Sequence, residues 1–260
     1  MNRIQGKTVV IAGATAGIGR ACATVLAAQG ANLVLLARRE ERLKELLPEL
    51  KEAQEEAGSA FVRIFPLDVR DREGVTRFVK FLEDEGIEPD VLVNNAGLAR
   101  GLDTLQEGKH EDWDDMIDTN IKGLLNMSRA LLPGMVQRNR GHVVNIGSIA
   151  GHIVYPKGNV YNATKFAVKA LTEAMSIDLV GTAVRVSSVD PGLVETEFSL
   201  VRFRGDADRA EKVYQGIDSL HPEDIADAVS YVINTPPHVN VLNMLVMPTV
   251  QRSPYVVDRE

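Results

Sequence analysis

A tyrosine and a lysine four residues apart, with a serine thirteen residues upstream of the tyrosine, are the residues of this chain best suited to chemistry. If residues 161–180 form a helix, Tyr161 and Lys165 lie on one face of it. A phenol is a poor acid–base group at neutral pH because its ordinary pKa is about 10. A neighbouring ammonium group favours the phenolate and lowers that pKa. With the Ser148 hydroxyl to hold an oxygen atom, the three residues can move a proton on or off a carbinol oxygen.

Taken alone, this spacing is equally typical of an ordinary exposed pair on a helix. A second, independent pattern near the N-terminus favours the chemical interpretation. Gly13, Gly17 and Gly19 stand between a strand-like and a helix-like segment. Glycine allows a sharp turn and a close approach to phosphate, and a helix N-terminus directs free N–H groups at a pyrophosphate. A glycine-rich turn without a ligand is the alternative, but its position after the first strand favours a dinucleotide site.

The residues after the second predicted strand indicate which dinucleotide binds. NAD sites commonly carry Asp or Glu at this point, bonded to the ribose 2′-hydroxyl. Here Arg38 and Arg39 follow the strand instead, and guanidinium groups match a 2′-phosphate well. The sequence therefore predicts NADP, with the solvated start of a helix as the alternative role for these arginines.

Short β-rich runs alternate with longer amphipathic segments along the chain. Strands are expected at residues 8–12, 32–37, 61–65, 91–94, 143–146, 184–189 and 243–247. Helices are expected at residues 18–29, 40–57, 72–85, 113–137, 159–180 and 222–235, with Pro48 and Pro133 predicted to break or kink two of them. This alternation predicts an α/β fold: a seven-stranded parallel sheet with helices on both faces, in a single domain over residues 1–260. The irregular stretches 98–112 and 190–206 should lie at the carboxyl ends of strands, where such sheets bind ligands.

Composition limits the classes of function. The net charge of −7 disfavours nucleic-acid binding. Cys22 is the only cysteine, so no intrachain disulfide can form; its expected role is a small core residue, which fits a cytoplasmic location. No apolar run approaches the roughly 20 residues of a membrane span, and the first residues lack the apolar region of a signal peptide. No metal site is expected, because the histidines show no ligand spacing; they are His110, His142, His152, His221 and His238.

Five motifs stand in order along nearly the whole chain. They are the glycines Gly13, Gly17 and Gly19, the run Asn94-Asn95-Ala96-Gly97, Asn120, the trio Ser148, Tyr161 and Lys165, and the group Pro191, Gly192 and Thr196. In this order they resemble the short-chain dehydrogenase/reductase family. The resemblance implies a Rossmann-like, doubly wound fold and a catalytic set of Asn120, Ser148, Tyr161 and Lys165. It also implies that Lys165 holds the nicotinamide ribose and that Asn120 holds a water molecule linking Lys165 to solvent.

The resemblance also implies a set of contacts with NADP(H). Asp68 and Val69 should border the adenine, Asn95 to Gly97 the adenosine ribose, and Thr196 the carboxamide. The complete expected set is Gly13, Thr15, Ala16, Gly17, Ile18, Gly19, Arg38, Arg39, Asp68, Val69, Asn95, Ala96, Gly97, Tyr161, Lys165, Pro191, Gly192, Val194 and Thr196. Two residues depart from the family pattern. Ala12 lacks the hydroxyl that usually ties the first strand to the Asn-Asn-Ala-Gly loop, and Ala16 lacks the basic side chain of many NADP-using members.

Within the family, the chain is most similar to NADP-dependent 3-hydroxy acid dehydrogenases that oxidise serine and allo-threonine. The stretches that carry this similarity are Asn94 to Ala99, Gly158 to Tyr161, Glu197 to Phe203 and Met247 to Thr249. The similarity implies a homotetramer and a small-molecule substrate. A 3-oxoacyl-carrier-protein reductase, another carbonyl reductase and a regulator that binds NADP without turnover are the alternatives.

A 3-hydroxy acid carries a carboxylate, which a cationic side chain should meet. Lys157, Arg202 and Arg204 are the candidates, and a solvated surface charge is the alternative for each of them. The two arginines lie in a predicted substrate lid at about residues 190–215.

Overall fold

Seven parallel strands form one sheet, in the order β3-β2-β1-β4-β5-β6-β7. The computed structural model describes residues 1–58 and 61–259. The strands are β1 (Thr8–Ala12), β2 (Asn32–Ala37), β3 (Val62–Pro66), β4 (Val91–Asn94), β5 (Gly141–Ile146), β6 (Val184–Pro191) and β7 (Asn243–Val246). The predicted parallel sheet is confirmed. Strand order reverses between β1 and β4, and this reversal opens a crevice at the carboxyl ends of the two strands.

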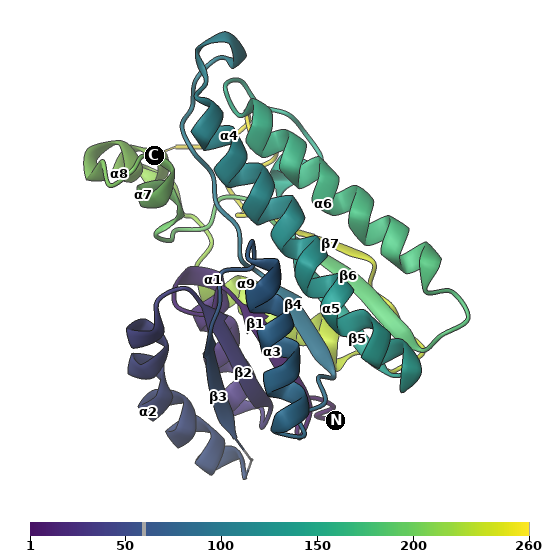
Figure 1. Cartoon of the computed structure of the whole chain (residues 1–260). Helices are drawn as coiled ribbons and strands as arrows, with labels where there is room; N and C mark the ends of the chain where they lie inside the picture. Colours follow the sequence, from purple (N-terminus) through teal and green to yellow (C-terminus); the bar gives the residue numbers. More distant parts are fainter. Residues whose placement is uncertain (59–60, 260) are drawn as a thin grey trace.

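Helices cover both faces of the sheet (Figure 1). They are α1 (Gly17–Ala28), α2 (Glu40–Ala57), α3 (Arg72–Asp84), α4 (His110–Ile117), α5 (Leu124–Gln137), α6 (Asn159–Asp178), α7 (Phe198–Arg202), α8 (Ala207–Tyr214) and α9 (Pro222–Asn234). Residues of α1, α2 and α9 share one buried cluster, and residues of α3, α5 and α6 pack in the other. The doubly wound arrangement follows from these two cores.

The first strand shows why its sequence is apolar from Val9 to Ala12. All five residues of β1 are buried, and successive side chains of a strand point to opposite faces. Val9 and Ile11 pack in the cluster with α1 and α9, while Val10 and Ala12 pack in the cluster with α3 and α5. A strand buried on both faces needs apolar residues at every position.

Pro48 and Pro133 were predicted to break or kink their helices, and the predicted break is wrong in both cases. Pro48 lies inside α2, which continues for 18 residues. Pro48 is exposed, so the carbonyl oxygen that loses a partner can bond to water, and the buried side chains of Leu43, Leu46 and Leu50 hold the helix on the core. Pro133 likewise lies inside α5. The predicted helix 113–137 is interrupted elsewhere, by a π-helical turn, η2 (Asp118–Gly123), between α4 and α5.

The segment after β6 is less irregular than the sequence predicts. Residues 190 and 191 still belong to β6, and two short helices follow, α7 and α8. In Figure 1 this pair projects from the carboxyl end of the sheet, beside the C-terminus of the chain. No helix of the described residues is long and apolar enough to cross a membrane.

Candidate active site

A cleft of about 500 Å³ opens at the carboxyl ends of the strands. Segments far apart in the sequence meet there: the β1–α1 turn, the residues after β4, β5 and β6, helices α6 and α7, and residues 251–259. The predicted site residues that line it are Gly13, Thr15, Ala16, Gly17, Ile18, Arg39, Asn95, Ala96, Gly97, Ser148, Tyr161, Lys165, Pro191, Gly192, Val194, Thr196 and Arg202. The predicted residues outside its lining are Gly19, Arg38, Asp68, Val69, Asn120, Lys157 and Arg204.

The β1–α1 turn has the geometry of a phosphate cradle. Gly13 has a φ of +75°, which side chains with a Cβ rarely adopt. A Cβ on Gly19 would lie 2.2 Å from the carbonyl oxygen of Gly13, so helix α1 can approach the turn only because residue 19 is glycine. No side chain of the described residues caps α1, and its first turn carries no acidic residue. Its free N–H groups are therefore available to an anion.

Asn95, in the loop after β4, supplies the hydrogen bond that a hydroxyl at position 12 would otherwise make. Asn95 donates hydrogen bonds through Nδ2 to the carbonyl oxygens of Ala12 (3.2 Å) and Gly13 (3.0 Å). The amide of Asn95 therefore ties the loop after β4 to the end of β1. An alanine at position 12 does not leave the loop unattached.

Both predicted phosphate-binding arginines are exposed immediately after β2. Arg39 lines the cleft. Arg38 lies close enough to Asp68 for its charge to act on that carboxyl group. Partial burial raises the pKa of Asp68, but hydrogen bonds from Arg70 and the charges of Arg70 and Arg38 together lower it below its ordinary value. Two cations thus follow the tip of β2, where a NAD site commonly carries an acid, and guanidinium groups suit a 2′-phosphate.

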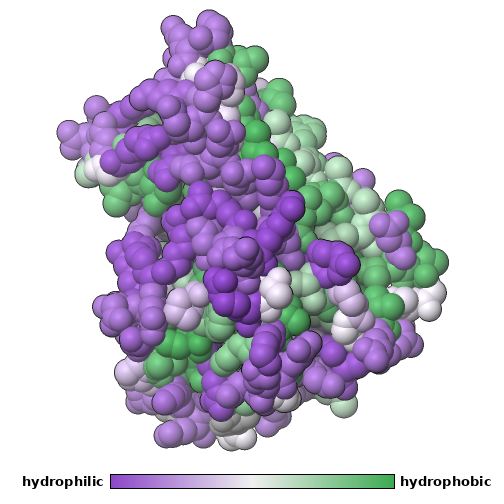
Figure 2. Space-filling view, viewed as in Figure 1, coloured by the Kyte–Doolittle hydropathy of each residue, from purple (hydrophilic) through white to green (hydrophobic). Residues whose placement is uncertain are grey.

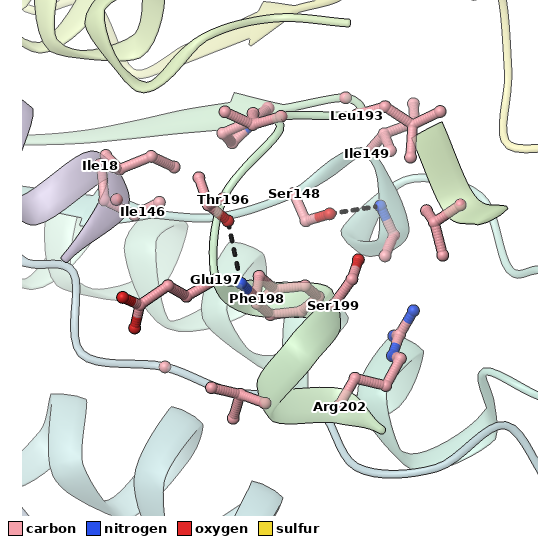
Figure 3. Close-up of a pocket in the computed structure, with 18 of the residues that line it drawn as sticks. Ile18, Ile146, Ser148, Ile149, Leu193, Thr196, Glu197, Phe198, Ser199 and Arg202 are labelled. Carbon is pink, nitrogen blue, oxygen red and sulfur yellow. Dashed lines mark hydrogen bonds between the residues drawn. The ribbon is translucent and has the colours of Figure 1, made fainter. Parts of the chain in front are cut away.

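Helix α6 brings the predicted acid–base residues together. Tyr161 and Lys165 are both buried, and the Lys165 Nζ lies 5.9 Å from the centroid of the Tyr161 ring. The Lys165 ammonium group donates a hydrogen bond of 2.8 Å to the carbonyl oxygen of Ile146 at the end of β5. Ser148 follows the same strand and is hydrogen-bonded to Tyr161. Its hydroxyl also accepts a bond from the amide of Ala150, drawn in Figure 3.

The pKa of Tyr161 is raised, whereas the sequence predicts that a neighbouring ammonium group lowers it. Burial raises the pKa of Tyr161 above its ordinary value, while the charge of Arg202 and the hydrogen bond with Ser148 oppose that rise. The cation that acts on the phenol is therefore Arg202, from helix α7, rather than the predicted Lys165. Burial also lowers the pKa of Lys165 to about 8, against the charge of Asp190, which raises it.

Asn120 lies behind the cleft rather than in its wall. Its Nδ2 donates to the carbonyl oxygen of Leu98 (2.8 Å) and to Thr164 Oγ1 (3.0 Å), and its Oδ1 accepts from the Leu98 amide (2.8 Å). The residue belongs to the π-helical turn η2, and such turns occur often at functional sites. Asn120 thereby joins the loop after β4 to helix α6.

Arg202 is the one predicted substrate residue that the structure places in the cleft. Its guanidinium group lies 5.0 Å from the centroid of the Tyr161 ring and 5.3 Å from that of Phe198, and it donates a 2.7 Å bond to the Tyr155 hydroxyl. The Arg202 Nε is buried and has no hydrogen-bond partner among the described residues. None of the ion pairs found among those residues includes Arg202. Figure 3 shows Arg202, Phe198 and Ser148 around the same cavity.

The other two cationic candidates lie elsewhere. Arg204 forms an ion pair with the buried carboxylate of Asp112 in α4. Lys157 is exposed in the loop before α6. Neither side chain lines the cleft.

Several residues of the cleft were not predicted as site residues. Tyr155, Tyr214, Gln251 and Arg259 all line it. The Gln251 Oε1 accepts a 2.9 Å bond from the amide of Leu193, so the C-terminal segment is fastened beside the residues after β6. Tyr155 could have been proposed from the sequence, because it is an aromatic residue close before Tyr161. No local sequence signal marks the C-terminal residues, because only the fold brings them to the cleft.

The arrangement is suited to proton transfer on an oxygen beside a bound dinucleotide. The described residues contain no group of His, Cys, Asp and Glu side chains that could hold a metal ion. Cys22 is buried in the core, and burial raises the pKa of its thiol to about 12. The titratable groups that line the cleft beside Ser148 instead include Tyr161, Lys165 and Tyr155.

Sequence comparisons agree with this geometry. A family model described as short chain dehydrogenase matches residues 7–205. The NADP-dependent 3-hydroxy acid dehydrogenase YdfG of Escherichia coli (strain K12) is 47% identical over 244 residues, which cover 94% of this chain and 95% of that protein. A sulfoacetaldehyde reductase of Chromohalobacter salexigens is 44% identical over 252 residues, 96% of this chain and 97% of that protein.

Solved structures are similar over the same extent. The closed form of serine dehydrogenase complexed with NADP⁺ superposes with a TM-score of 0.90 at 45% identity, covering 97% of this chain and 100% of that one. The serine dehydrogenase of Escherichia coli gives a TM-score of 0.80 at 41% identity, covering 94% of this chain and 99% of that one.

Proposed function

This chain belongs to the short-chain dehydrogenase family, and we propose that it interconverts small 3-hydroxy acids, including serine or allo-threonine, with the corresponding carbonyl compounds. It is an oxidoreductase, and the prediction of NADP as its cofactor is confirmed by the NADP-dependent relatives and the NADP complexes. The observation that carries the substrate proposal is the Arg202 guanidinium group, which faces Tyr161 in the cleft without a carboxylate partner among the described residues.

The residues of the chain divide the work of binding the cofactor. The glycine turn at Gly13 and the open end of α1 are suited to the pyrophosphate, and Arg38 and Arg39 to a 2′-phosphate. Lys165 is proposed to hold the nicotinamide ribose. When bound, NADP accepts a hydride from the carbinol carbon, and NADPH returns one in the reverse direction.

In the proposed oxidation, Ser148 holds the substrate hydroxyl and Tyr161, as phenolate, takes its proton. Arg202 and Ser148 both favour the phenolate. Arg202 also binds the substrate carboxylate with its free donor, and this contact fixes the distance between the carboxylate and the carbon that reacts. In reduction, Tyr161 returns the proton. The role of Asn120 in holding a water molecule that links Lys165 to solvent remains part of the proposal.

Residues 190–215 are proposed to act as the substrate lid of a single domain. Helix α7 carries Arg202 and Phe198 into the cleft. Arg100, in the loop after β4, donates a 2.7 Å bond to the carbonyl oxygen of Val201, and the Gly101 amide donates to that of Arg202 (3.1 Å). These contacts hold the lid helix over the acid–base residues.

A sulfonate is the second candidate for the anionic group of the substrate. The sulfoacetaldehyde reductase relative is 44% identical, and a guanidinium group can bond to a sulfonate as it does to a carboxylate. A 3-oxoacyl-carrier-protein reductase is less well supported, because the net charge of −7 does not favour docking of an acidic carrier protein.

The chain is further proposed to form a homotetramer in the cytoplasm. Figure 2 shows apolar residues gathered over α5 and α6. Phe166 and Ile177 of α6 are 40% and 72% exposed, and Val180, after the end of α6, is 82% exposed. An apolar patch of this kind marks an interface between proteins. Measuring the mass of the particle in solution by light scattering tests the assembly.

The substrate proposal is tested by following the reduced nicotinamide spectrophotometrically. NADP and NAD are compared across L-serine, allo-threonine, 3-hydroxybutyrate, 3-hydroxypropionate, isethionate and simple alcohols. Turnover with NADP on the hydroxy acids, well above that on the alcohols, is expected. A preference for neutral alcohols, or for acyl thioesters alone, would reject the proposal.

A further inference from the structure

A second buried charge lies next to the proposed catalytic lysine. Asp190, at the end of β6, is 1% exposed. Its Oδ1 accepts a bond from the Ser188 hydroxyl, and its Oδ2 accepts bonds from Asn243 Nδ2 and, at 2.5 Å, from His152 Nε2. Because a carboxylate only accepts hydrogen bonds, the Nε2 of His152 carries a proton. Three side chains, from β6, from β7 and from the residue after η3, are thus directed at this one carboxylate.

The carboxylate and the lysine meet at the same peptide. A Cβ on Gly147 would lie 1.9 Å from Asp190 Oδ1, so the carboxylate rests directly against that glycine. The carbonyl oxygen of the preceding residue, Ile146, accepts the 2.8 Å bond from Lys165. Gly147 is also held to β6 by the bond from its amide to the carbonyl oxygen of Val189 (2.9 Å). The negative charge thus lies directly behind the strand end that receives the ammonium group.

His152 connects this carboxylate to the loop that begins with the proposed catalytic serine. Ser148 leads into a single turn, η3 (Ile149–Gly151), and His152 is the residue that ends it. The imidazole is 19% exposed and reaches across to the end of β6. The pairing therefore fastens the far end of the serine loop to the neighbouring strand.

The charged and titratable groups around Lys165 are few. Its own helix contributes Tyr161. Strand β6 contributes Asp190, whose charge acts on Lys165, and the loop after η3 contributes His152, bonded to that carboxylate. Arg202 of α7 lies over the Tyr161 ring. The turn η2 contributes Asn120, whose side chain is neutral and bonds to Thr164 of α6.

We propose that Asp190 is a positioning residue that keeps Lys165 in its ammonium form and, through His152, anchors the loop that carries Ser148. The proposal rests on the catalytic roles proposed above for Tyr161, Lys165 and Ser148. It assigns to the buried carboxylate of Asp190, outside the catalytic set, the task of sustaining the charge of the lysine, and to His152 that of holding the serine loop.

The sign of the effect follows from the two influences on the lysine. Burial lowers the pKa of Lys165 to about 8, and the charge of Asp190 raises it. Removing the carboxylate charge therefore lowers the pKa further, and the lysine loses its proton at a lower pH. Activity that requires the ammonium group is full below this pKa and is lost as the pH rises through it. The alkaline limb of the pH profile should move to lower pH.

The direct experiment compares the wild-type protein with Asp190→Asn by NMR of lysine labelled at Cε and Nζ. The Lys165 signal is identified by its loss in Lys165→Met. Loss of a neighbouring charge should lower the Lys165 pKa by about 1 unit or more. The alkaline limb of kcat/KM should move by the same amount. Asp112→Asn is the matched control, because it neutralises another buried carboxylate, that of Asp112 in α4, which is paired with Arg204. This control should leave both the Lys165 pKa and the alkaline limb of kcat/KM unchanged.

His152→Gln and His152→Ala separate anchoring from charge. Glutamine retains an N–H donor, whereas alanine releases the loop. Alanine should lower kcat on every substrate without moving the Lys165 pKa, and glutamine should recover most of the loss. An Asp190→Asn protein with the wild-type Lys165 pKa would overturn the proposal.

Wild-type protein that shows the predicted NMR behaviour but no turnover of hydroxy acids would instead reject the proposed function.

Discussion

Replacing Arg202 with methionine separates substrate binding from acid–base chemistry. Methionine keeps an unbranched apolar chain over the rings of Tyr161, Phe198 and Tyr155, which the guanidinium group approaches at 5.0, 5.3 and 5.9 Å. It removes the donor proposed to bind the carboxylate. A hydrogen bond to a charged group contributes about 1.5–3 kcal/mol. Because about 1.36 kcal/mol is tenfold in rate, kcat/KM for 3-hydroxypropionate should fall about 13- to 160-fold relative to that for 1-propanol.

The same substitution should also move the pH profile. The charge of Arg202 lowers the pKa of Tyr161 against the effect of burial, so removing it raises that pKa. Oxidation requires the phenolate and is therefore lost as the pH falls through the tyrosine pKa. The acid limb should shift to higher pH for the acid and the alcohol alike.

Initial rates with both substrates across pH measure the two effects together. Arg204→Met and Lys157→Met are the controls, since one cation is paired with Asp112 and the other is exposed outside the cleft. Equal losses of kcat/KM on 3-hydroxypropionate and 1-propanol in Arg202→Met would refute the carboxylate contact.

Three further changes test the remaining parts of the site. Tyr161→Phe should abolish turnover while NADPH binding, measured by fluorescence titration, stays nearly intact; retained activity would remove the tyrosine from the acid–base role. Gly19→Ala should abolish or severely weaken NADP binding in the same titration, because its Cβ would lie 2.2 Å from the Gly13 carbonyl oxygen; near wild-type affinity would show that the turn is not the phosphate site. Replacing both Arg38 and Arg39 with serine should raise the KM for NADP and leave that for NAD little changed, since only NADP carries the 2′-phosphate; equal changes for the two cofactors would reject the assignment.

The fold was predictable because its signals are local. The apolar run in β1 indicates a strand covered on both faces. The glycines that follow it indicate a tight turn between this strand and the next helix. The four-residue spacing of Tyr161 and Lys165 places both on one helical face without any knowledge of the rest of the chain. Each of these features depends on the residues within a few positions.

The parts that were missed depend on contacts across the chain. The π-helical turn η2 interrupts the predicted helix at the point where Asn120 bonds to Leu98 and Thr164. Because these contacts come from distant segments, no proline in the sequence indicates the position of the turn. The replacement of the Ala12 tie by Asn95 likewise appears only when β1 and β4 lie side by side. The influence of Arg202 on Tyr161 requires helix α7 to lie over α6. The sequence predicts an irregular segment after β6 and no helix at this position.

In the proposed mechanism, a buried tyrosine performs proton transfer on a hydroxy acid whose carboxylate is held by Arg202. A crystal structure of Tyr161→Phe with NADP⁺ and 3-hydroxypropionate tests this mechanism. The substrate carboxylate should lie against the guanidinium group of Arg202, and the substrate hydroxyl should lie against Ser148, facing the ring at position 161. A carboxylate bound elsewhere, with the hydroxyl remote from both residues, would refute the mechanism.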